Sequence, residues 1–126
     1  MTTVLISGSS SGIGRAIAEY FLQNGMRVIG LARDHKKFVW KNDDYIPINV
    51  ELSDISKLSN LIKEVLKKHP SISTFVSNAG YGDFKSLENF SAEQIEHFID
   101  VNLVSHIVLC RALITHLKSN MWSSRC

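Results

Sequence analysis

A glycine-rich turn directly after a short apolar run limits the possible folds of this chain more than any other feature. Residues 4–6 are Val-Leu-Ile, which is typical of a buried strand, and residues 7–14 read Ser-Gly-Ser-Ser-Ser-Gly-Ile-Gly. Glycines at the end of a strand let a phosphate approach the backbone, because they have no Cβ and adopt positive φ at little cost. A helix that starts in such a turn directs the positive end of its dipole to the same place. The pattern predicts a binding turn for the diphosphate of a dinucleotide.

Two other interpretations of these glycines fit the sequence less well. A nucleoside triphosphate loop requires Gly-Lys and then Ser or Thr at a fixed distance from its first glycine, and no such group follows Gly8. A flavodoxin-like signalling domain needs an acidic phosphorylation pocket at the ends of the first and third strands, which this sequence does not provide. Both interpretations are therefore disfavoured.

Apolar periodicity predicts strands that alternate with amphipathic helices. The expected strands are residues 3–7, 27–32, 45–50 and 73–78. The expected helices are residues 12–24, a second helix capped by Ser53 or Asp54 and stopped at His69-Pro70, and a last helix that follows a Ser91/Gln94 capping box and runs to about Leu117. Pro47 indicates that the third strand lies at a sheet edge, where a missing N–H group is tolerated.

This order of elements predicts an α/β fold with a Rossmann-type, doubly wound parallel sheet, because right-handed crossovers place helices on both faces. The expected strand order is 3-2-1-4, a truncated form of the full sheet. Ligands of such sheets bind beyond the carboxyl ends of the strands, where residues 8–14 and 78–80 both fall. We interpret residues 1–126 as the N-terminal part of a single dinucleotide-binding domain, with residues 118–126 irregular.

Composition excludes several kinds of partner. The chain has 126 residues, 44% of them hydrophobic and 21% charged, as in ordinary folded domains. The net charge of +2 is small and its basic residues are dispersed, so no nucleic-acid surface is expected. The N-terminus enters a strand without a signal sequence, no apolar run approaches a membrane span, and Cys110 and Cys126 lack metal-ligand spacing. We expect a cytoplasmic protein with reduced thiols, no metal site and no membrane.

The residue after the second strand bears on the choice of coenzyme. A dinucleotide without a 2′-phosphate favours an Asp or Glu about 20 residues past the glycines, whereas this chain has Arg33 there. Arginine pairs with a 2′-phosphate and a carboxylate would repel it, so the sequence favours NADP(H) over NAD(H). The alternative is a solvated arginine beside Asp34.

Three motifs together resemble the short-chain dehydrogenase/reductase family. Residues 7–14 are similar to its TGxxxGIG coenzyme loop, with Ser in place of Thr. Residues 77–80, Ser-Asn-Ala-Gly, resemble its NNAG segment, and residues 101–103, Val-Asn-Leu, resemble its VN motif. The spacing of all three agrees with the family over nearly the whole chain. Glu51 departs from the Asp usual after strand three, and Ser11 from the basic residue of many NADP-preferring members.

The resemblance implies a set of coenzyme-binding residues. Gly8, Gly12, Ile13 and Gly14 would line the diphosphate, Ser9 and Arg33 would lie near the adenosine ribose and its 2′-phosphate, and Asn78, Ala79 and Gly80 would line the coenzyme on the fourth strand, with Ser10 in the same loop as the glycines. Members of the family commonly pair through the helix that carries the VN motif. A homodimer through the helix containing Asn102 is therefore expected.

Asn102 is the candidate catalytic residue that this chain retains. It falls on the apolar stripe of the last helix, where Asn is not favoured and where a buried amide needs partners. The resemblance assigns it to an Asn-Ser-Tyr-Lys tetrad that holds a water in the proton relay. The alternative is an amide satisfied by neighbouring backbone. His106, one turn further on, is interpreted as a packing or interface residue.

The catalytic Tyr-x-x-x-Lys of the family has no clear counterpart here. Tyr81 and Lys85 match the spacing but lie in a loop directly after the fourth strand, so we interpret this match as coincidence. We expect that the chain is a fragment of an NADP(H)-dependent oxidoreductase that interconverts an alcohol and a carbonyl in its full-length form. The alternative is a catalytically inactive nucleotide-binding or interaction module.

Overall fold

The computed structural model of this chain describes residues 2–36, 38–81 and 85–125. Four strands form one parallel sheet in the order β3-β2-β1-β4. The strands are β1 (Thr3–Ser7), β2 (Arg27–Ala32), β3 (Tyr45–Asn49) and β4 (Ile72–Ser77). The helices are α1 (Gly12–Gln23), α2 (Ile55–Lys68), α3 (Ala92–Ile99) and α4 (Ser105–Arg125), with short 3₁₀ and π turns at Leu87–Asn89 and Asp100–Val104. The predicted strand order and parallel sheet are confirmed.

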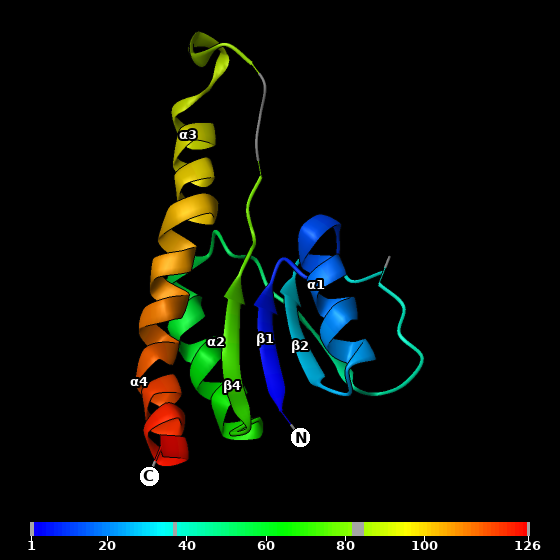
Figure 1. Cartoon of the computed structure of the whole chain (residues 1–126). Coiled ribbons are helices and arrows are strands. Elements are labelled where there is room, and N and C mark those ends of the chain that lie inside the picture. Colours follow the sequence, from blue (N-terminus) through cyan, green and yellow to red (C-terminus); the bar gives the residue numbers. More distant parts are fainter. Residues whose placement is uncertain (1, 37, 82–84, 126) are drawn as a thin grey trace.

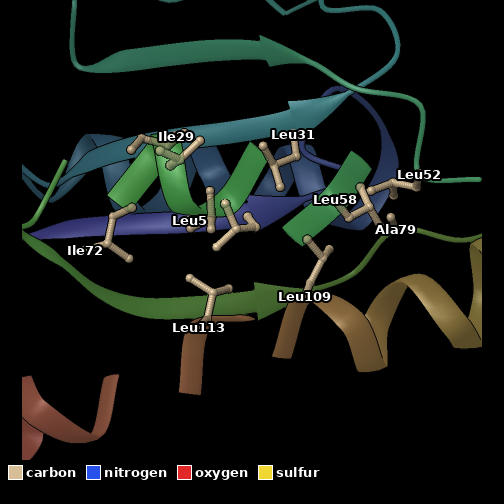
Figure 2. Packing of buried hydrophobic residues seen from close by; sticks show 11 residues of the cluster. Leu5, Ile29, Leu31, Leu52, Leu58, Ile72, Ala79, Leu109 and Leu113 are labelled. Atoms are coloured by element: carbon tan, nitrogen blue, oxygen red, sulfur yellow. The ribbon is translucent and has the colours of Figure 1, made fainter. Parts of the chain in front are cut away.

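Helices cover both faces of the sheet (Figure 1). Side chains along a strand alternate between faces, so Val4 and Ile6 of β1 pack toward α1 while Leu5 packs toward α2 and α4. Figure 2 shows Leu5 among Leu58 of α2 and Leu109 of α4. Because both faces are covered, β1 and most of β2 are buried along their length.

Most boundaries lie within one residue of the expected ones, and the edge position of β3, which contains Pro47, is as predicted. The prediction for residues 118–126 was wrong, because α4 continues to Arg125; Cys126 lies outside the described residues. Residues 118–125 contain neither glycine nor proline. A helix propagates cooperatively through such a segment once its preceding turns are formed.

The helices α3 and α4 join through the π turn into one long helix along the edge of the sheet (Figure 1). Within the part of the chain that the structure describes, Ala92–Ser119 is long and apolar enough to meet the length and composition of a membrane span. The expectation that no segment approaches such a span was therefore wrong. The finding does not place the helix in a membrane, since α4 packs against α2 and β4 of its own domain.

Candidate coenzyme site

A cleft of about 950 Å³ lies beyond the carboxyl ends of the strands. It is lined by the turns after all four strands and by one side of the long helix. The lining residues are Gly8, residues 10–13, residues 31–33, residues 50–52, residues 78–81, Phe90, Glu93, Gln94, His97 and Val101. The predicted residues Gly8, Ser10, Gly12, Ile13, Arg33, Asn78, Ala79 and Gly80 are thus brought together on its wall.

The glycine-rich turn has a conformation and close contacts that only glycine, which has no Cβ, allows. Gly8 has φ +74° and Gly12 has φ +56°, both in the left-handed region. A Cβ on Gly8 would lie 2.8 Å from the Ala79 Cα, and one on Gly14 would lie 2.0 Å from the Gly8 carbonyl oxygen. Gly14 does not itself line the cleft; it lets α1 start against the turn.

The start of α1 leaves room for a negative charge. Its N-cap residue Ser11 makes no side-chain capping bond, and the first turn contains no acidic residue. The first amides of a helix have no intrahelical acceptor and carry its positive dipole end. Because Ser11, Gly12 and Ile13 line the cleft, a phosphate placed there would meet these amides.

Hydrogen bonds connect the turns after β1 and β4. The buried Ser7 hydroxyl oxygen accepts from the backbone N–H groups of Asn78 at 3.0 Å and Ala79 at 3.2 Å. The Asn78 side-chain amide donates to the Gly8 carbonyl at 3.2 Å. Asn78 therefore shapes the glycine-rich turn as well as lining the cleft.

Asn102 holds the segment after β4 rather than lining the cleft. Its Oδ1 accepts from the Tyr81 backbone N–H at 2.9 Å, and its Nδ2 donates to the Phe98 carbonyl at 3.0 Å. His106, one turn later, bonds to the Ser77 hydroxyl and to the Ala79 carbonyl. Backbone groups therefore satisfy the Asn102 amide, which is the alternative expected from the sequence. A role of Asn102 in a proton relay stays a prediction.

Ser9 does not line the cleft, and its expected place near the adenosine ribose stays a prediction. Ser9 is fully buried and its hydroxyl lies 2.8 Å from the Tyr45 hydroxyl, away from the cleft. The pair fits because Gly30 lies beneath it: a Cβ there would meet Ser9 Oγ at 2.1 Å. A buried phenol hydroxyl needs a partner, and Ser9 supplies one.

Arg33 lies at the rim of the cleft and is exposed. It also lines a neighbouring hollow formed with residues 34–36, Pro47 and Asn49. The Asp34 carboxylate accepts from the Lys36 backbone N–H at 2.8 Å and so closes a local turn.

Sequence reasoning missed a bridge across the mouth of the cleft. The Tyr81 hydroxyl lies 2.9 Å from Nδ1 of His97, and Nε2 of His97 lies 4.0 Å from Glu51 Oε1, an ion pair when the imidazole is protonated. Glu51 could have been found, because it follows the carboxyl end of β3. His97 could not, since nothing in a helical sequence indicates which distant loop its side chain meets.

Comparison with known proteins gives the family. The sequence model described as short chain dehydrogenase matches residues 2–124. A 3-oxoacyl-[acyl-carrier-protein] reductase of Buchnera aphidicola is 31% identical over 117 residues, which are 89% of this chain and 48% of that protein. The ligand-free aldohexose dehydrogenase of Thermoplasma acidophilum superposes with a TM-score of 0.80 at 32% identity, covering 92% of this chain and 44% of that one. A 4-hydroxyisoleucine dehydrogenase complexed with NADH and succinate has a TM-score of 0.82 at 26% identity, covering 93% and 53%.

The chain spans about half the length of these relatives. The match covers the sheet, the glycine-rich turn and the long helix, and the sheet order is that of the N-terminal half of a Rossmann fold. The family consists of oxidoreductases that use nicotinamide dinucleotides. The chain belongs to the short-chain dehydrogenase/reductase family.

Proposed function

We propose that this chain binds NADP(H) in the cleft and forms the coenzyme-binding part of a cytoplasmic oxidoreductase that interconverts an alcohol and a carbonyl compound. The observation that carries the proposal is the glycine-rich turn at the start of α1, which presents amides to a cleft at the carboxyl ends of β1 and β4. Gly8 and Gly14 leave no room for a Cβ against Ala79 and the Gly8 carbonyl, and this close packing of the turn supports a backbone that presents its amides to a ligand.

In this proposal, different residues around the cleft bind different parts of the coenzyme. The amides of residues 11–13 bind the diphosphate, and the turn at residues 78–80 supports the ribose nearer the substrate. Leu31, Val50, Leu52 and Val101 provide apolar walls for the adenine. The bound nicotinamide would supply or accept a hydride, and Asn102 would hold the segment after β4 in place while that transfer occurs.

Arg33 decides the preference for NADP(H) in this proposal. The Arg33→Gln variant removes the cation that pairs with the 2′-phosphate, so NADPH affinity falls roughly tenfold or more and NADH affinity is unchanged. Isothermal titration of the 126-residue chain with each coenzyme measures both values. Lys63→Gln, which removes an exposed cation on α2 away from the cleft lining, is the matched control. Equal losses for NADPH and NADH would contradict the assignment.

A nucleotide-binding module without turnover is the second candidate for the chain alone. Tyr81 and Lys85 are its only Tyr-x-x-x-Lys match, and Lys85 Nζ donates to Gln94 at 3.2 Å and lies 4.6 Å from the centroid of the Phe90 ring. That placement gives Lys85 a structural role at the start of α3. We expect NADPH to raise the melting temperature of this chain without any loss of NADPH absorbance in the presence of carbonyl substrates. Turnover by these 126 residues would overturn this candidate.

A further inference from the structure

A continuous chain of side-chain hydrogen bonds runs beneath the glycine-rich turn, outside the cleft. The Ser9 hydroxyl lies 2.8 Å from the Tyr45 hydroxyl, and the Tyr45 hydroxyl lies 2.8 Å from Nδ1 of His35. On its far side, Nε2 of His35 lies 2.9 Å from the Ile48 carbonyl oxygen. These bonds join three segments: the turn after β1, the connection after β2, and β3.

The chemistry of the partners fixes the direction of each bond in the neutral imidazole. A carbonyl can only accept, so Nε2 of His35 donates to Ile48 and Nδ1 is left as an acceptor. The Tyr45 hydroxyl must then donate to His35, and its oxygen accepts from Ser9. Burial raises the pKa of the Tyr45 phenol above its usual value of 10.0, so this hydroxyl keeps the proton that it donates.

The same tyrosine also holds the connection after β2 by packing. The Phe38 ring stacks on the Tyr45 ring with centroids 4.0 Å apart, and the Phe38 backbone N–H donates to the His35 carbonyl at 2.9 Å. The turn that the Asp34 carboxylate closes with the Lys36 backbone N–H includes His35 and is part of the same segment. Arg33 lies two residues before His35. The contacts of His35 with Tyr45 and Ile48 therefore restrain the backbone that carries Arg33.

We propose that His35 and Tyr45 are positioning residues for the 2′-phosphate of the coenzyme: their hydrogen bond holds residues 33–36 in the conformation that presents Arg33 at the rim of the cleft. This inference rests on the proposed function of the cleft. Without the anchor, the segment would have to be ordered when the coenzyme binds, and that ordering reduces affinity. NADH has a hydroxyl in place of the 2′-phosphate that Arg33 would pair with, so we expect its affinity to be independent of the anchor.

The Tyr45→Phe variant tests the anchor, because it keeps the ring that stacks on Phe38 and removes only the hydroxyl. We expect NADPH affinity to fall roughly fivefold, the equivalent of one hydrogen bond, with NADH affinity unchanged. Tyr20→Phe removes a hydroxyl from an exposed tyrosine of α1 and serves as the matched control. An unchanged NADPH affinity, or an equal loss for both coenzymes, would overturn the inference.

A double-mutant cycle shows whether the anchor acts through Arg33. In an Arg33→Gln background, Tyr45→Phe should have no further effect on NADPH affinity. Additive losses would overturn the positioning role. If Tyr45→Phe does not fold, His35→Leu gives the same test, since a leucine side chain offers no acceptor to the Tyr45 hydroxyl.

Nitrogen-15 NMR of the unmodified chain gives a readout that does not involve the coenzyme. We expect the neutral imidazole of His35 to carry its proton on Nε2, and a proton on Nδ1 instead would overturn the inference. A chain that binds neither coenzyme would overturn the proposed function together with this inference. A preference for NADPH over NADH that Tyr45→Phe leaves unchanged would overturn this inference alone.

Discussion

At the scale of single residues, the candidate coenzyme site depends as much on glycines, which have no Cβ, as on side chains. The glycine pattern was sufficient to predict the turn, because only glycine permits both the positive φ of Gly8 and the contact between Gly14 and the Gly8 carbonyl. The burial of the Ser9 side chain against Tyr45 could not be predicted from the sequence. Side chains in an irregular turn follow no period, and the partner Tyr45 lies 36 residues away in the sequence.

Gly14→Ala should lower both stability and coenzyme affinity. The new methyl group would meet Gly8 and Asn78, so α1 or the turn must shift; we expect a loss of about 1–3 kcal/mol in the free energy of unfolding. Urea denaturation with and without NADPH measures both effects. Gly25→Ala is the control, because Gly25 has φ +80° with open space around it, and we expect it to cost roughly 1–2 kcal/mol without changing affinity.

His69 gives the folded chain a dependence on pH. Burial lowers its pKa below 6.5, and the nearby positive charges of Arg27 and Lys68 lower it further. The unfolded chain therefore takes up a proton first as the pH falls through 6.5, and the free energy of unfolding decreases until the folded-state pKa is passed. We expect His69→Gln to lose less stability than the parent as the pH falls through 6.5 toward the lowered folded-state pKa of His69. Parallel profiles would contradict this assignment.

At the scale of elements, the strands and α1 were predictable because apolar period, glycine and capping residues all agree there. The π turn was not. Within it and just after it, Asn102 and Ser105 use their side chains to bond the Phe98 and Val101 carbonyls four residues earlier, and such bonds distort helices. Asn102 also accepts from the Tyr81 backbone N–H, and the helix sequence does not indicate this contact with a distant segment.

The capping box that starts α3 was predicted and is confirmed. Ser91 Oγ accepts from the Gln94 backbone N–H at 3.1 Å, and Gln94 Oε1 accepts from the Ser91 backbone N–H at 2.9 Å. Ser91→Ala should lower the free energy of unfolding by about 1 kcal/mol and speed amide exchange in Ala92–Ile99. Ser86→Ala is the control, because Ser86 makes no side-chain capping bond, and it should leave exchange unchanged. Equal exchange in the two variants would contradict the role of the cap.

At the scale of the whole molecule, alternation of strands and helices predicted the sheet, its order and the edge that carries the cleft. The outward face of the long helix was harder to interpret from sequence, since its apolar residues could equally have been core. The structure leaves a stripe of them exposed: Ile95, Ile99, Leu103, Ile107 and Ile114. Apolar surface of this kind on one helix favours association.

We propose that two copies of the chain pair through this stripe. Placing charges in a buried apolar contact is unfavourable, so Leu103→Glu combined with Ile107→Glu should shift the chain from dimer to monomer in analytical ultracentrifugation. Val39→Glu, at an exposed position in the connection between β2 and β3, is the control and should leave the dimer intact. A monomeric parent chain would contradict the pairing.

One helix carries both this stripe and the two side chains, Asn102 and His106, that hold the segment after β4. A displacement on its outer side would therefore reach the segment after β4, which lines the cleft. If two chains pair through the stripe, pairing and occupancy of the cleft would be thermodynamically linked, and a ligand that tightens the pair would bind more tightly to paired chains, by the same factor.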